Sequence, residues 1–167
     1  MATNVLNLTK IENQSILTDV ERFNLSEQIR SCVLLLEEKW TAKKLVPELE
    51  FSEIDIEANE ELLRQVWINL IDNAVKFVDP GGEVKVTIER SEGWLTVSVS
   101  DKGPSIPPQE RNRIFSKFYQ SDHSHAAEGN GIGLAVVKKI VDLHGGKVRA
   151  ESADGITVFT VTLPEAQ

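Results

Sequence analysis

The sequence predicts an α+β fold, a two-layer sandwich in which a mixed, mostly antiparallel sheet carries about three helices on one face. Segments with the helical spacing of apolar residues alternate with period-two segments that come as hairpins. The regular strand-helix-strand rhythm of a parallel sheet is absent. With 167 residues, 41% of them hydrophobic, the chain is long enough for one domain with a substantial core.

The elements are expected in a definite order along the chain. Residues 4–12 have a helical stripe with nothing to bury it against, so 1–13 are interpreted as the end of a longer helix or a linker. A short strand follows over 14–23. Asn24 or Ser26 can cap the next helix, which runs to about Lys44 before Pro47 forbids its continuation.

The rest of the chain alternates between hairpins and helices. The expected elements are two short extended pieces at 49–52 and 54–58, a helix from Asn59 to about Val78, a hairpin over 84–88 and 95–99, a helix from 131 or 132 to 143, and a second hairpin over 147–151 and 157–163. The intervening stretch 101–130 holds one helical candidate, 108–118. A connection of this length in a compact domain is usually functional or mobile.

Charge and composition exclude several classes of protein. Lys plus Arg number 18 against 26 Asp plus Glu, a net charge of −8, so we expect no nucleic acid and no membrane contact. No run approaches the ~18 apolar residues of a membrane span, and no basic-then-apolar segment opens the chain, so a cytoplasmic location is expected. The one cysteine, Cys32, lies in an apolar run that predicts a buried, unreactive thiol.

The helix over 59–78 has a narrow polar stripe and a wide apolar arc. The stripe comprises Gln65, Asn69, Asp72, Asn73 and Lys76. Asparagine is disfavoured inside helices, and a solvent face normally carries longer charged residues. Either the two asparagines sit at a wet edge, or they line a polar cavity where an amide oxygen can bind a hard cation and Lys76 can meet an anion.

Two further segments carry weaker signals. Asp101 directly follows an apolar strand, and alone it would be an ordinary turn aspartate. Gly129, Gly131 and Gly133 precede or open a helix, where backbone N–H groups can approach a phosphate. Neither the P-loop pattern nor the dinucleotide fingerprint fits these glycines.

Taken in order, these segments resemble the boxes of the sensor histidine kinases. Residues 65–77 resemble the asparagine box, Asp101-x-Gly103 the first glycine box, 114–118 the phenylalanine box, and 129–134 with 144–146 the second glycine box and its helix end. The resemblance covers about residues 14–164. It implies the ATP-binding catalytic domain of that family over 14–167, with a Bergerat-type sandwich, and identifies 1–13 as the end of the preceding dimerisation helix or a linker.

The resemblance also implies roles for individual residues. Asp101 would accept a hydrogen bond from the amine of adenine, and Asn73 would bind Mg²⁺. Asn69 and Lys76 would act on the phosphate side as the catalytic residues. The full set implied to bind the nucleotide is Asn69, Asn73, Lys76, Asp101, Gly103, Ile106, Phe118, Gly129, Gly131, Ile132, Gly133, Leu134 and Thr157. Residues 119–128 would form the lid, whereas Phe115 and Phe118 could anchor it or simply be core.

The sequence departs from the family pattern in three places. Ser105 replaces the second glycine of the first glycine box, and Gln120 stands where many members have a phosphate-binding arginine. No phosphoacceptor motif surrounds His123, His125 or His144, for which solvated or capping roles are expected.

Two functions follow as expectations. The first is a Mg-ATP-dependent histidine kinase domain that phosphorylates a histidine on a separate dimerisation and phosphotransfer domain, with a response regulator downstream. Asn69 argues against ATP hydrolysis, because relatives that hydrolyse ATP carry a glutamate base there and an amide cannot take a proton. The alternative is a degenerate ATP-binding module that docks a partner without phosphoryl transfer, which Ser105 and Gln120 would favour.

Overall fold

The computed structural model describes residues 16–102 and 132–167. The elements are β1 (Glu21–Asn24), α2 (Leu25–Leu35), α3 (Glu37–Ala42), β2 (Glu48–Glu50), β3 (Asp55–Ala58), α4 (Glu60–Phe77), β4 (Val84–Ser91), β5 (Trp94–Lys102), α5 (Ile132–Leu143), β6 (Lys147–Ala153) and β7 (Ile156–Pro164). The expected helices at 4–12 and 108–118 lie outside the described residues.

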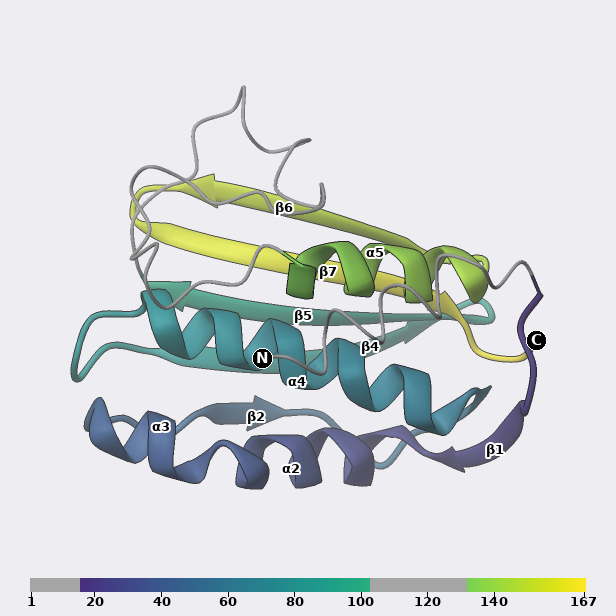
Figure 1. Ribbon diagram of the computed structural model, residues 1–167, viewed down its shortest axis with the longest axis horizontal. Helices are drawn as coiled ribbons and strands as arrows, with labels where there is room; N and C mark the ends of the chain where they lie inside the picture. Colours follow the sequence, from purple (N-terminus) through teal and green to yellow (C-terminus); the bar gives the residue numbers. More distant parts are fainter. Residues whose placement is uncertain (1–15, 103–131) are drawn as a thin grey trace.

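The described elements form two layers, with α2, α4 and α5 side by side on one face of a sheet (Figure 1). The sheet has five strands in the order β2-β4-β5-β7-β6. β2 runs parallel to β4, and the other neighbours are antiparallel. The predicted α+β sandwich with a mixed, mostly antiparallel sheet is therefore confirmed.

Period-two burial explains why the central strands bind the helix layer. In β5 and β7 the buried side chains alternate with half-buried ones, so one face of the sheet is apolar and the other is rich in Ser and Thr. Val97, Val99, Phe159 and Val161 belong to the core that the helices cover. Trp67 of α4 is the largest fully buried side chain of this core among the described residues.

The N-terminal part differs from the expected elements in two respects. The strand predicted over 14–23 is shorter, because β1 begins at Glu21 and pairs with β3 in a separate two-stranded sheet. The helix predicted to reach Lys44 breaks at Leu36 into α2 and α3. The cause of the break is local. The Trp40 indole donates a hydrogen bond of 2.9 Å to the Val33 carbonyl. In an unbroken helix that carbonyl would accept from a backbone N–H of the next turn.

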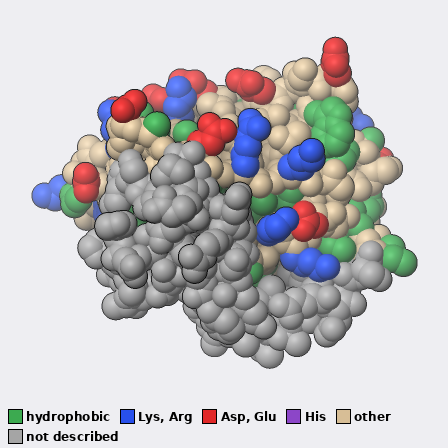
Figure 2. Space-filling view, turned by 90° about the horizontal axis from the view of Figure 1, so that it is seen from above, with side chains coloured by type: hydrophobic (Ala, Val, Ile, Leu, Met, Phe, Trp, Pro, Cys, Tyr) green, Lys and Arg blue, Asp and Glu red, His purple; other side chains and the backbone are tan. Residues whose placement is uncertain are grey.

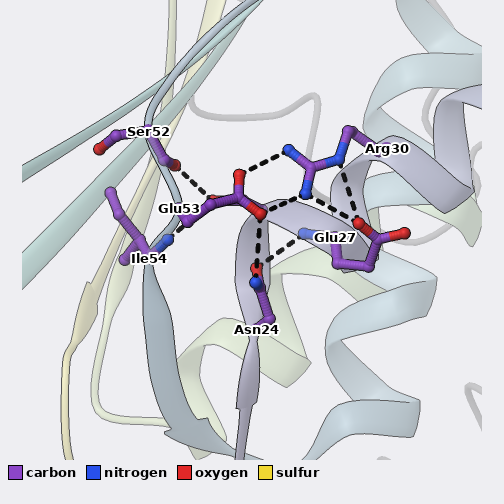
Figure 3. A network of polar contacts seen from close by, with 7 residues as sticks. Asn24, Glu27, Arg30, Ser52, Glu53 and Ile54 are labelled. Atoms are coloured by element: carbon purple, nitrogen blue, oxygen red, sulfur yellow. Dashed lines mark hydrogen bonds and ion pairs between the residues drawn. The ribbon is translucent and has the colours of Figure 1, made fainter.

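A polar network fixes the beginning of α2 to the segment before β3 (Figure 3). The side chain of Asn24 accepts from the Glu27 N–H and so caps the helix. Arg30 donates to both carboxylate oxygens of Glu53 and also to Glu27, which lowers the pKa of Glu53. Ser26 donates to the Ser52 carbonyl and accepts from the Ile54 N–H. The network therefore places α2 against the segment leading into β3.

The face of the molecule on which β6 lies carries many charged side chains (Figure 2). Figure 2 shows Lys and Arg side chains gathered over α5 and β6, next to the residues that are not described. Lys138 pairs with Asp142 at 3.2 Å, and Arg149 pairs with Glu151 at 3.6 Å. The cations of this side are therefore partly balanced by acidic neighbours.

Composition predicts an unreactive Cys32 thiol and no membrane-spanning helix. Cys32 is buried, and burial raises the pKa of its thiol to about 11, as expected for an unreactive cysteine. Among the helices of the described residues, none is both long enough and apolar enough to cross a membrane.

The end of α5 is joined to the beginning of α4 through His144. This side chain is buried, its Nδ1 lies 2.8 Å from the Ile140 carbonyl oxygen, and its Nε2 accepts a hydrogen bond from the Asn59 N–H. The ring is therefore neutral, with its proton on Nδ1. Asn59 is also the N-cap of α4, where its side chain accepts from the Leu62 N–H. The capping role expected for His144 thus extends across two helices.

Acid should destabilise the fold through His144. Burial lowers the pKa of this ring below its ordinary value of 6.5. The stabilisation is therefore fully present above about pH 6.5 and is lost as the pH falls below it, because the unfolded chain binds a proton that the folded ring resists. Urea unfolding of the wild type and of His144→Gln at pH 7.5 and pH 5.5 should show the larger loss of stability in the wild type. Equal losses of stability in the two proteins would contradict the lowered pKa of His144.

Candidate functional site

The predicted site residues of α4 lie on its half-buried polar side. Gln65, Asn69, Asp72, Asn73 and Lys76 are all half-buried, whereas the apolar arc of the helix is buried in the core. Asn69 donates from Nδ2 to the Gln65 carbonyl at 2.8 Å. Its side-chain oxygen is thus the end available to a cation or a donor. The stripe is therefore neither part of the core nor fully exposed.

Gln65 carries a buried acceptor on this stripe. Its Oε1 is buried and has no hydrogen-bond partner, the one such side-chain atom among the described residues. A buried carbonyl oxygen without a partner is costly and calls for an explanation. Its position one turn before Asn69 places an unmet acceptor on the same polar stripe.

Lys76 lies beside an acidic residue that the sequence reasoning did not assign to the site. Asp72 is 3.5 Å from the Lys76 ammonium and 2.8 Å from that of Lys39 in α3. The spacing of Asp72 and Lys76, four residues apart on one helix, was the signal that could have identified this pair. The Lys76 ammonium is thus paired with a carboxylate of its own helix.

Lys43 is a second residue that sequence reasoning missed. Its ammonium donates to the carbonyls of Lys76 and Val78, at 2.6 and 2.7 Å, and so caps the C-terminal end of α4. Its own carbonyl accepts from the Gly81 N–H at 2.7 Å. A lysine after one helix gives no sign in the sequence that it caps another.

Asp101 is the second-last residue of β5 and lies on the face of the sheet that the helices cover. It is 3% exposed, and none of the described residues forms a hydrogen bond with its carboxylate. Burial raises the pKa of Asp101 from 3.8 to about 7, and the positive charge of Lys43 opposes that rise. Because no described residue donates to this buried carboxyl, the position suits a donor supplied by a ligand.

The backbone brings Asp101 close to the end of α4. The Asp79 N–H, just after α4, donates to the Lys102 carbonyl, just after Asp101. Thr157, also in the predicted set, lies directly opposite Asp101 in the register of β5 and β7 and is buried. In Figure 1 the C-terminal ends of α4, β5 and β6 and the beginning of β7 lie at the same end of the molecule.

The other predicted site residues are only partly described. Ile132, Gly133 and Leu134 begin α5, where Gly133 is buried and Leu134 packs against the core. Outside the described residues lie Gly103, Ser105, Ile106, Phe115, Phe118, Gln120, the expected lid at 119–128, Gly129 and Gly131.

The described residues suit Mg²⁺ only if one protein oxygen binds it together with water and phosphate oxygens. No group of three or more His, Cys, Asp or Glu within 16–102 and 132–167 could hold a metal ion. Mg²⁺ does not require such a cage, because it keeps several waters and is commonly bound by one or two protein oxygens plus phosphate oxygens. A single amide such as that of Asn73 fits this mode.

Comparison with known proteins connects the geometry with one family. Residues 58–167 match the family model described as histidine kinase-, DNA gyrase B-, and HSP90-like ATPase. The chain is 36% identical over 172 residues to the circadian input-output histidine kinase CikA of Synechococcus elongatus, covering 99% of this chain and 23% of CikA. It is 31% identical over 168 residues to the heme sensor protein HssS of Staphylococcus aureus strain Newman, covering 98% of this chain and 36% of HssS.

Solved structures agree with this result. The catalytic domain of histidine kinase ThkA superposes with a TM-score of 0.81 at 33% identity, covering 89% of this chain and 97% of that domain. Full-length ShkA, crystallised with AMPPNP, has a TM-score of 0.82 at 28% identity, covering 97% of this chain and 34% of ShkA. The chain therefore spans about a third or less of the length of HssS, CikA and ShkA.

Proposed function

Because the chain belongs to the histidine kinase-, DNA gyrase B-, and HSP90-like ATPase family, we propose that it is the Mg-ATP-binding catalytic domain of a sensor histidine kinase. In this proposal it transfers the terminal phosphoryl group of ATP to a histidine on a separate dimerisation domain. The observation that carries the proposal is the buried carboxyl of Asp101, which lacks a partner among the described residues and lies at the same end of the fold as the amide-bearing end of α4.

The two parts of this site suit the two ends of ATP. The Asp101 carboxylate is an acceptor, which matches the 6-amino group of adenine and rejects the 6-carbonyl of guanine. Asn73 offers an amide oxygen for Mg²⁺, and Lys76 offers a cation for the phosphates. The crystal structure of ShkA with AMPPNP supports a nucleotide site in this fold.

The side chains of α4 favour transfer to histidine over transfer to water. Mg²⁺ would supply neutralisation of phosphate charge, which is most of what phosphoryl transfer requires from its catalyst. Asn69 cannot act as a general base, so water in the site would not be activated. A neutral imidazole needs no base to attack phosphorus. Release of Lys76 from Asp72 would then let its ammonium face the transferring group.

The partners in this proposal are a dimerisation and phosphotransfer domain and a response regulator downstream, on the cytoplasmic side of the cell. ThkA, which matches with a TM-score of 0.82 at 30% identity over 98% of this chain, has been crystallised with response regulator protein TrrA. That structure supports the same class of partner here.

Mixing this chain with a phosphotransfer domain of the family and Mg-ATP tests the proposal. We expect acid-labile phosphohistidine on the added domain, and about 10²-fold slower formation with Asn73→Ala, because the amide that helps place the charge-neutralising cation is lost. Arg64→Ala, an exposed change on the same helix, is the matched control and should leave the rate unchanged.

Two outcomes would contradict the proposal. Tight ATP binding without phosphohistidine would favour the docking module. A rate of phosphohistidine formation that Asn73→Ala leaves unchanged would show that Asn73 is not the metal ligand.

A further inference from the structure

Beside Asp101, three neighbouring strands carry a buried polar row. On the helix-covered face, Val99, Phe159 and Ala150 face one another across β5, β7 and β6. Two residues nearer the same end of the sheet, on the same face, stand Asp101, Thr157 and Ser152. The apolar core thus gives way in one step to a polar row at the end of the sheet.

The members of this row are in register and buried. Asp101 is opposite Thr157, and Thr157 is opposite Ser152. Their exposed fractions are 3%, 4% and 6%. The Ser152 and Thr157 hydroxyl oxygens are 3.0 Å apart, and either can donate. Thr157 therefore lies between an acidic acceptor and a second hydroxyl.

The direction of that hydrogen bond decides what Thr157 presents to a ligand. If Ser152 donates to Thr157, the Thr157 proton is free to point away from Ser152. Thr157 is then a donor next to the acceptor Asp101. The 6-amino edge of adenine has the complementary order, an amine donor followed by a ring-nitrogen acceptor, whereas guanine has the reverse order.

We propose that Ser152 is a positioning residue for purine recognition: its hydroxyl holds Thr157 as a donor beside Asp101, so that the pair selects a 6-aminopurine over a 6-oxopurine. The proposal rests on the nucleotide site described above and adds a third strand to it. The Ser152 hydroxyl contacts that of Thr157 and would act on the base through it. A site built to hydrogen-bond one edge rejects the opposite edge strongly, because its buried groups are then left unpaired.

Calorimetric titration with Mg-ATP and Mg-GTP tests this role in the wild type, Ser152→Ala, Thr157→Val and the double variant. Ser152→Ala should weaken ATP binding by about 3- to 10-fold and leave GTP binding unchanged, so that the preference for ATP falls. Thr157→Val should lower the preference at least as much. The double variant should resemble Thr157→Val alone, since Ser152 acts through Thr157.

Matched controls lie on the opposite face of the same sheet. Ser98 and Thr160 are paired across β5 and β7 and are half-buried on the outer face, so Ser98→Ala and Thr160→Val should leave both affinities unchanged. Ser152→Thr, which keeps the hydroxyl, should retain the preference for ATP and serves if Ser152→Ala folds poorly.

The outcomes separate this inference from the proposed function. Equal weakening of ATP and GTP by Ser152→Ala, or additive effects in the double variant, would overturn the positioning role while the nucleotide site stands. A wild-type chain that binds no adenine nucleotide would instead overturn the proposed function.

Discussion

Replacing Asp101 with asparagine should weaken Mg-ATP binding by about 1–3 kcal/mol, the range for leaving a buried polar group badly paired. The amide keeps the size of the carboxyl but loses its charge and turns one acceptor into a donor. Calorimetry of the wild type and Asp101→Asn measures the difference. Asp55→Asn changes a half-buried aspartate of β3 that pairs with Arg22; it is the matched control and should bind ATP as the wild type does.

The same substitution should stabilise the nucleotide-free protein. Because burial raises the pKa of Asp101 to about 7, its contribution to stability is fully present below about pH 4 and is lost as the pH rises to 7. Above pH 7, Asp101→Asn should therefore be more stable than the wild type, by up to about 4 kcal/mol. ATP affinity of the wild type should rise with pH up to about 7, as the carboxyl ionises.

Unchanged affinity in Asp101→Asn would contradict the adenine assignment. A variant that is less stable than the wild type at pH 8 would contradict the raised pKa of the carboxyl. The two measurements are independent, so a role in binding and a role in stability can be told apart.

Replacing Trp67 with alanine should destabilise the fold by about 3–5 kcal/mol, because it removes the largest buried side chain of α4. The indole also donates to the Gln28 side-chain oxygen at 2.7 Å, and Gln28 in turn donates to the Glu60 carbonyl. Trp67→Ala would leave the buried side-chain oxygen of Gln28 without its donor. Urea unfolding monitored by far-UV circular dichroism measures the loss.

Trp94→Ala is the control for this experiment. Trp94 is 44% exposed at the beginning of β5, so its loss should cost about 1 kcal/mol or less. Similar losses for the two tryptophans would contradict the place of Trp67 in the core.

Much of the fold could be predicted because local signals agree with packing. The cap Asn59 and the turn after Val78 bound α4 as expected, and period-two alternation identified both hairpins. The break at Leu36 could not be predicted, because it depends on an indole folding back onto a carbonyl of the preceding turn. The separate sheet of β1 and β3 depends on long-range pairing, which period-two patterns do not specify.

The candidate site was predictable where a single element carries it. The stripe on α4 and the position of Asp101 at a strand end could be inferred from spacing. Lys43 and Ser152 could not, since each acts through another element: Lys43 caps a helix more than thirty residues away, and Ser152 reaches Thr157 across a strand pair. Such contacts follow from topology and register, which appear only in the folded chain.

Titration of the ¹⁵N-labelled protein with Mg-AMPPNP, followed by NMR, tests most directly whether the end of α4 and the end of β5 form one nucleotide site. We expect saturable shifts in the resonances of Asn69, Asn73, Lys76, Asp101 and Thr157, and none in those of Ser98 and Thr160 on the outer face. Saturable binding that shifts the resonances of the outer face and leaves those of Asp101 and Asn73 unchanged would contradict a single nucleotide site at these two ends.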